Sequence, residues 1–224
     1  MDKQSLALSF GNSLTDEVSS IAGEYAELGL DTLVEDGLFK DIPIVSTFMA
    51  VYRIGNSIWE RHHIAKLIAF LNEINKGIVD EEKREKYREK FLGNDHFRNQ
   101  ELEYILILID RYINFDKPQM LAKLYLAYLD CKITWQEFTQ YAEIIDRFLP
   151  GDLVWLDEHR LSECNPDSIA VDGVLRLISM GLVTQKWSRT SVYDAQGNDI
   201  GGVDMKGYTL TNFGMKFRSI ITRG

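Results

Sequence analysis

The chain has 224 residues, of which 45% are hydrophobic and 26% charged, and its formal net charge at pH 7 is −9. This composition is typical of a folded globular protein with one large domain or two small ones, and it excludes wholesale disorder. The acidic balance disfavours nucleic acid and anionic membranes as partners of the whole chain.

The cysteines and the N-terminal residues indicate which cellular compartment to expect. Cys131 and Cys164 are too few for a disulfide framework and form no CxxC pair. The first residues lack the basic region and apolar core of a signal peptide. No run approaches the roughly 18 apolar residues that a membrane span requires. We therefore expect a reduced, cytoplasmic setting and no membrane span.

The N-terminal part is expected to form a helix between Ser13 and Gly37, followed by the apolar-rich stretch 37–75. Within that stretch the apolar residues keep helical spacing but change face near residues 60–63. We expect one long helix or a pair of helices over 46–75. The second stripe consists of Ile64, Leu67, Ile68, Leu71 and Ile74. The first stripe contains Phe48, Tyr52 and Trp59, which are candidate partner-binding residues if this face is exposed.

Four further helices are predicted up to residue 150. Residues 80–93 form a highly charged helix whose acids precede its bases, as the helix dipole favours. Leu102–Ile113 and Met120–Leu129 are the most hydrophobic candidates, and we expect a central apolar helical hairpin over 100–130. Thr134 and Glu137 form a capping box that begins the last helix of the body. Residues 1–150 are thus predicted to be an acidic, all-helical body.

The pattern changes in residues 151–224. A short helix (152–161) and a second helix (167–180) precede an extended run from Gly181 to Tyr193. Residues 194–198 carry a hairpin turn signal, and the chain returns through 203–210 before a last helix capped by Thr211. The fold class expected for the whole chain is mainly α, with a small α+β domain at the end.

This order of elements resembles a winged helix. The spacing Leu175-x-x-Ile178-x-x-Gly181-Leu182-Val183 is similar to the exit from the third helix of many bacterial winged-helix domains, and Tyr208-Thr209-Leu210-Thr211-x-x-Gly214-x-x-Phe217 is similar to the segment after their wing. The resemblance covers about a third of the chain, and the helical body resembles no family with a known function.

The resemblance implies that the helix 167–180 would enter the major groove if the domain bound DNA. The basic residues available for this are Arg176, Lys186, Arg189 and Lys206. Residues 166–224 carry seven basic and five acidic side chains, and two aspartates accompany the single arginine of that helix. This is a poor phosphate surface, so the charge pattern favours a protein-interaction module over DNA binding.

No arrangement of residues predicts an enzyme. His62 and His63 are adjacent and point in different directions on a helix, so they do not chelate one metal together. His159 and Glu163 are four residues apart beside Cys164, but no second cluster supports a metal site. No nucleophile, phosphate-loop or zinc-protease signature occurs. We expect no catalysis, no cofactor and no metal.

Three functions follow as hypotheses. The first is a non-enzymatic regulatory or adaptor protein that acts through protein contacts of the helical body and the winged helix, or through self-association. The alternative is a DNA-binding transcription regulator that uses the winged helix. The second alternative is a peripheral membrane effector that uses residues 37–59 as an interfacial helix.

Overall fold

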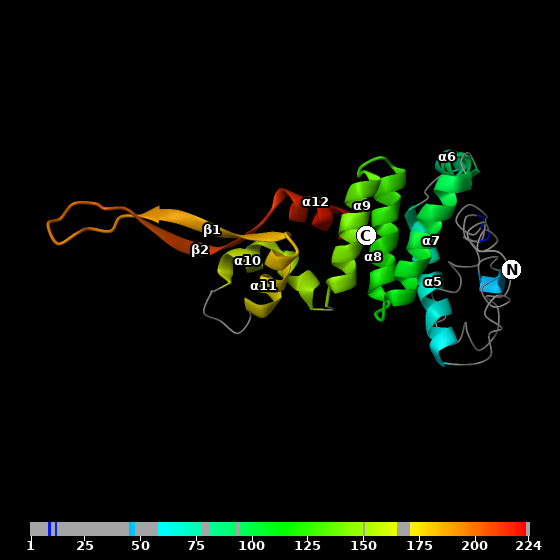
Figure 1. Cartoon of the computed structure of the whole chain (residues 1–224), viewed down its shortest axis with the longest axis horizontal. Coiled ribbons are helices and arrows are strands. Elements are labelled where there is room, and N and C mark those ends of the chain that lie inside the picture. Colours follow the sequence, from blue (N-terminus) through cyan, green and yellow to red (C-terminus); the bar gives the residue numbers. More distant parts are fainter. Residues whose placement is uncertain are drawn as a thin grey trace. The chain divides into compact units, whose positions relative to one another are not determined.

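The computed structural model describes residues 9, 12, 45–47, 58–77, 81–92, 95–149, 151–164 and 171–222. The chain forms two compact units, residues 1–146 and residues 147–224, which are described separately. The predicted boundary between 150 and 151 lies close to this division. The described chain is mainly helical, with one small two-stranded antiparallel sheet near the C-terminus (Figure 1).

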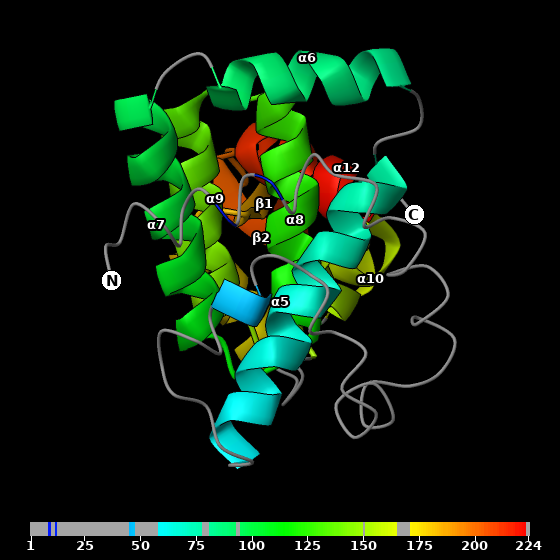
Figure 2. The same ribbon diagram turned by 90° about the vertical axis from the view of Figure 1, so that its right-hand side faces the viewer.

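The first unit consists of helices in its described part. They are α5 (Ile58–Gly77), α6 (Glu81–Leu92), α7 (Asp95–Arg111), α8 (Asp116–Leu129) and α9 (Trp135–Arg147). The apolar run at 104–109 is helical, as its charged flanks predict. Helix α6 lies across the ends of the other helices (Figure 2).

Helix α5 forms the spine of this unit. Its predicted second stripe is entirely buried, at Ile64, Leu67, Ile68, Leu71 and Ile74. Helix α8 packs more closely on α5 than on α7, although the sequence predicts an α7–α8 hairpin at the centre. At one end of the α5–α8 contact, a Cβ placed on Gly77 would lie 2.3 Å from Cδ1 of Leu126, so the absence of a side chain allows this close approach.

Aromatic side chains fill the space between α8 and α9. Trp135 stacks on Phe138 with ring centroids 4.8 Å apart, and Tyr125 meets Phe138 edge to face. The predicted capping box is confirmed, because the backbone N of Thr134 donates to Oε2 of Glu137 at 2.8 Å while the N of Glu137 donates to Oγ1 of Thr134.

Polar groups buried in α5 tie it to the end of α7. Nζ of Lys66, which is only 3% exposed, donates to the carbonyl oxygens of Asp110 and Tyr112, each at 2.8 Å. These are carbonyls at the C-terminal end of a helix, where the helix itself offers no partners. The lysine therefore acts as a buried cap, and its burial lowers the pKa of Lys66.

The second unit contains η2 (Asp152–Leu156), α10 (Glu158–Glu163), α11 (Val171–Ser179), β1 (Val183–Thr190), β2 (Gly202–Leu210) and α12 (Asn212–Ile221). The single helix predicted over 152–161 is wrong. Asp157 is extended and its side chain accepts hydrogen bonds from the backbone N of His159 and Arg160, so it caps a new helix and separates it from the 3-10 turn.

A small core holds the second unit together. It contains Leu156, Leu161, Val174, Leu177, Leu182 and Phe217. Thr211 caps α12 as predicted, with its Oγ1 accepting from Gly214 N at 2.9 Å. A Cβ placed on Gly214 would lie 2.0 Å from the carbonyl oxygen of Leu182, so α12 sits directly on the start of β1.

Among the described residues, no helix is both long enough and apolar enough to cross a membrane. The stretch 37–59 of the membrane hypothesis lies outside the described residues, apart from 45–47 and the backbone of 58–59.

Candidate interaction surface

The candidate partner residues of the first apolar stripe stay a prediction. Phe48 and Tyr52 lie outside the described residues. Trp59 belongs to α5 by its backbone, and its side chain is not among those described.

Arg176, the basic residue of the predicted recognition helix, is engaged within the domain. Its Nη2 donates to Oδ1 of Asp152 at 2.7 Å, and its Nε donates to the same carboxylate at 3.2 Å. The Asp152 side chain is fully buried and also accepts a hydrogen bond from the backbone N of Leu149 at 2.8 Å. A buried carboxylate needs its counter-ion, so this arginine fastens α11 to η2. The residues of α11 that remain exposed are Asp172, Leu175 and Ser179, none of them basic.

The other three predicted basic residues lie on the β1–β2 hairpin. Lys206 pairs with Asp204, Nζ to Oδ2 at 2.8 Å. Lys186 and Arg189 are exposed and form no ion pair with any residue that the structure describes. The structure therefore does not join the four candidates into one cationic surface.

The hairpin has two distinct faces beyond a bulge. The strands pair from Val183–Leu210 to Lys186–Gly207, and the register then shifts so that Trp187 faces Met205. The new register continues through Arg189–Val203 to the bridge between Tyr193 and Asp199. We call residues 187–205 the outer ribbon. It extends away from α10 and α11 (Figure 1).

One face of the outer ribbon gathers large side chains, because alternate residues of a strand share a face. We call this the aromatic face. Its large side chains are Trp187, Arg189, Tyr193, Val203 and Met205, and Asp199 lies opposite Tyr193 on the same face. The exposed fractions of its large apolar side chains include 54% for Trp187, 65% for Tyr193 and 71% for Val203. A Cβ placed on Gly201 would lie 3.6 Å from Nη2 of Arg189, so the arginine lies over this glycine on the same face.

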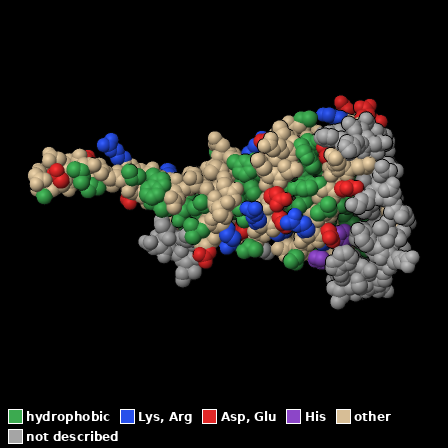
Figure 3. All heavy atoms as spheres, in the orientation of Figure 1, with side chains coloured by type: hydrophobic (Ala, Val, Ile, Leu, Met, Phe, Trp, Pro, Cys, Tyr) green, Lys and Arg blue, Asp and Glu red, His purple; other side chains and the backbone are tan. Residues whose placement is uncertain are grey.

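The opposite face of the ribbon carries smaller, β-branched side chains. A Cβ placed on Gly202 would lie 2.5 Å from Cγ2 of Val192 and 3.0 Å from Cγ2 of Thr190, which places these side chains together. Ile200, 63% exposed, follows by alternation. Hydrophobic side chains exposed along the hairpin, and acidic side chains near its tip, are visible in Figure 3.

The tip of the hairpin is an ordered acidic turn. The Asp194 carboxylate accepts hydrogen bonds from the backbone N of Gln196 and Asn198 and from Nδ2 of Asn198. These bonds to Asn198 and its neighbours lower the pKa of Asp194, and the bond from Gly201 N lowers the pKa of Asp199. Both carboxylates are therefore ionised at neutral pH and are held in place.

The base of the hairpin is fixed by α10. Gly207 has φ +125°, a conformation that favours glycine, and a Cβ there would lie 3.3 Å from the carbonyl oxygen of Ser162. Strand β2 thus packs on α10 up to the bulge, while the outer ribbon has no such support from the described residues.

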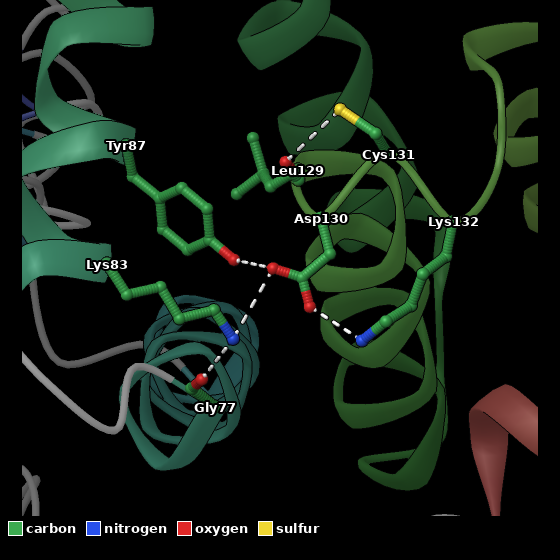
Figure 4. A network of polar contacts seen from close by, with 7 residues as sticks. All are labelled: Gly77, Lys83, Tyr87, Leu129, Asp130, Cys131 and Lys132. Atoms are coloured by element: carbon green, nitrogen blue, oxygen red, sulfur yellow. Dashed lines mark hydrogen bonds and ion pairs between the residues drawn. The ribbon is translucent and has the colours of Figure 1, made fainter.

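The described part of the helical unit contains networks of polar side chains. One of them surrounds Asp130, whose carboxylate accepts a hydrogen bond from Tyr87 at 2.5 Å and lies 2.7 Å from Nζ of Lys132 and 3.4 Å from Nζ of Lys83 (Figure 4). Its groups are satisfied by one another, which is the pattern of a structural junction. In the described part of the chain, no group of three or more His, Cys, Asp or Glu could hold a metal ion.

The sequence indicates Lys186, Arg189 and Lys206 of the hairpin only as DNA contacts of the alternative function, and it gives no separate role to Trp187. The alternation of Trp187, Arg189 and Tyr193 was available as a signal. The partners Val203 and Met205 were not, because the bulge that sets their register is not visible in the sequence.

Comparison with family models, with curated proteins and with solved structures finds no match for the chain. The inference of function therefore depends on the geometry of the outer ribbon.

Proposed function

We propose that the chain is a non-enzymatic adaptor or regulatory protein whose C-terminal unit is a winged-helix-like module that contacts other proteins through the aromatic face of its outer ribbon. The observation that carries this proposal is the exposure of Trp187, Tyr193 and Val203 on one face beside Arg189. Trp, Tyr and Arg are the residues most enriched in the energetic centres of protein interfaces. The order α10, α11, hairpin, α12 supports the winged-helix likeness.

The solvation of both faces of the outer ribbon in the described structure is a second reason to expect a partner. A two-stranded hairpin is marginally stable in water unless a hydrophobic face is covered. The outer ribbon holds its register from Trp187 to Tyr193 with both faces solvated in the described structure. Covering the aromatic face with a partner would stabilise the ribbon and bury its largest apolar side chains.

A tagged pull-down from the native host tests the proposal with a matched pair of variants. Val203→Asp places a carboxylate in the aromatic face, whereas Ile200→Asp places one at a similarly exposed β-branched residue of the opposite face. We expect Val203→Asp to reduce recovery of the specific partner by about tenfold or more, because a change at the energetic centre of an interface weakens binding by about this much. Ile200→Asp should recover the partner like the wild type. Equal recovery by all three proteins contradicts the proposal.

DNA binding is the rival function, favoured by Lys186 and Arg189, two exposed cations that form no ion pair with a described residue. Fluorescence anisotropy with duplex DNA at about 50 mM salt gives this rival its best chance, because counterion release is then most favourable. Our proposal predicts no saturable binding. Binding that Lys186→Ala with Arg189→Ala abolishes and Val203→Asp leaves intact would establish the rival instead.

A further inference from the structure

We propose that the partner of the aromatic face is a second copy of this chain, with the two outer ribbons packed face to face and antiparallel. The inference rests on the proposed function and names the occupant of the same surface. Two properties of the ribbon point to a second copy. Its basic side chains lie toward one end and its acidic side chains toward the other, and its exposed apolar side chains can pack against the same side chains of another copy.

The charges near the base of the ribbon and at its tip are opposite and have no counter-ion among the described residues. Lys186 and Arg189 lie toward the base, and Asp194 and Asp199 lie at the tip. None of the four forms an ion pair with a described residue, since the ion pair of the hairpin joins Lys206 to Asp204. Over residues 183–210 the three basic and three acidic side chains balance. The hairpin is thus a neutral, dipolar element in an acidic chain.

An antiparallel pair of ribbons brings together the opposite charges that the aromatic face carries, Arg189 and Asp199. A two-fold axis near the middle of the ribbon places the base of each copy beside the tip of the other. Arg189 of each copy then lies near Asp199 of the second copy, and the same contact recurs on the other side of the axis, as in every isologous interface. A parallel arrangement would instead place like charges together at both ends.

The apolar side chains match in the same arrangement. Trp187 stands at one end of the aromatic face and Tyr193 at the other, six residues along the strand, a separation of about 20 Å. Antiparallel packing brings the tryptophan of one copy beside the tyrosine of the second, with Val203 between them. The opposite face lacks such a pair, because its exposed apolar side chains, Val192 and Ile200, both lie toward the tip.

The exposed area of the aromatic face determines the dimer affinity that we expect. From their exposed fractions, Trp187, Tyr193 and Val203 offer roughly 400 Å² per copy, and Met205 and Arg189 add to this. A stable interface buries about 800 Å² on each partner, and smaller interfaces belong to reversible complexes. We therefore expect a dimer whose fraction rises with protein concentration in the micromolar range.

Sedimentation velocity and light scattering on the full chain, from about 1 to about 200 µM, test the dimer. We expect the mass to rise toward twice the chain mass of 25.8 kDa for the wild type and for Ile200→Asp. Val203→Asp should stay monomeric over the same range. A monomeric wild type, a Val203→Asp protein that still dimerises, or an Ile200→Asp protein that no longer does, each overturns the proposal.

A charge-reversal mixture tests the antiparallel arrangement. Arg189→Glu and Asp199→Arg should each weaken the dimer about tenfold or more, because each homodimer then contains two like-charged contacts. Mixing the two variants restores the opposite charges in both contacts, so a heterodimer should form in the equimolar mixture. Asp199→Arg also loses the hydrogen bond to Gly201 N, and the rescue on mixing excludes that loss as the cause. Absence of rescue overturns the proposal.

The failure of this inference is distinguishable from failure of the proposed function. A chain that is monomeric in every buffer but recovers a different protein through Val203, and not through Ile200, retains the proposed function and loses the dimer.

Discussion

At the scale of single residues, His63 shows how burial sets a protonation state in this fold. Its side chain is 5% exposed, and Nδ1 lies 3.0 Å from Oδ1 of Asp110. Burial, with the nearby charge of Lys66, lowers the pKa of His63 to about 4, although Asp110 opposes the change. The histidine is therefore neutral in the folded protein at neutral pH.

This gives a pH prediction with a definite sign. In the unfolded chain His63 takes up a proton near pH 6.5, whereas in the folded chain it does so only near pH 4. The free energy of unfolding should therefore fall as the pH falls from about 6.5 to about 4, by up to about 3 kcal/mol from this residue. Urea unfolding followed by far-UV circular dichroism at several pH values measures the slope.

His63→Gln removes the titration, so its pH slope should be flatter than that of the wild type. His159→Gln changes an exposed histidine that contacts Glu163 and should keep the wild-type slope. An unchanged slope in His63→Gln would assign the acid sensitivity to other groups.

At the scale of elements, Tyr87 is a buried anchor of α6. Among its described side chains only Tyr87 is buried, and the hydroxyl of Tyr87 donates to Asp130. Burial alone would raise the pKa of Asp130, but the hydrogen bonds from Lys132 and Tyr87 and the charge of Lys83 hold it below its usual value. Lys83 also donates to the carbonyl oxygen of Gly77 at 2.9 Å, which joins α6 to the end of α5.

Tyr87→Phe should therefore loosen α6 selectively. Loss of a hydrogen bond to a carboxylate costs about 1.5–3 kcal/mol, and α6 has little other apolar burial in its described part to offset it. Hydrogen exchange should become faster in α6 with little change in α8. Tyr104→Phe, whose hydroxyl makes an exposed contact with Glu143, serves as the matched control. Uniform acceleration over all helices would contradict a local role.

A glycine pair tests the packing of the second unit. Gly214→Ala would place a Cβ 2.0 Å from the backbone oxygen of Leu182, and backbone at both sides leaves no flexible atom to yield. We expect a loss of more than about 2 kcal/mol in the stability of residues 147–224, seen as a lowered thermal transition. Gly151→Ala meets nothing within 4 Å and should change the transition little. Equal effects of the two changes would argue against this contact.

The sequence predicts local features better than packing partners. The capping box at Thr134, the buried stripe of α5 and the turn after Tyr193 follow from spacing and residue type alone. The close approach of α5 to α8 does not, because it depends on Gly77 meeting Leu126 across 49 positions of the chain. The break at Asp157 was missed because the flanking residues are all compatible with one helix.

The residues of the aromatic face are likewise not predictable from the sequence alone. Hairpin strands were predictable, but which side chains share a face depends on the bulge after Lys186, which moves Met205 opposite Trp187. Without the bulge the alternation of β2 would be inverted relative to β1. Likewise, nothing in the sequence indicates that Arg176 pairs with a buried Asp152.

At the scale of the whole molecule, the charge distribution distinguishes association through the aromatic face from non-specific association of the acidic chains. The chain carries −9 at pH 7, yet its hairpin is neutral. Contact through the aromatic face therefore brings balanced charge together, whereas contact between the acidic residues 1–165 of two chains meets net repulsion at neutral pH.

That repulsion should vanish near the isoelectric point of about pH 5.0. As the pH falls from 7 to 5, we expect light scattering to rise to a maximum near pH 5.0 at low salt, for Val203→Asp nearly as strongly as for the wild type, because this association uses no defined surface. Circular dichroism on the same samples distinguishes it from acid unfolding, which His63→Gln reduces. Scattering that Val203→Asp abolishes at pH 5.0 would instead show that acid association also proceeds through the aromatic face.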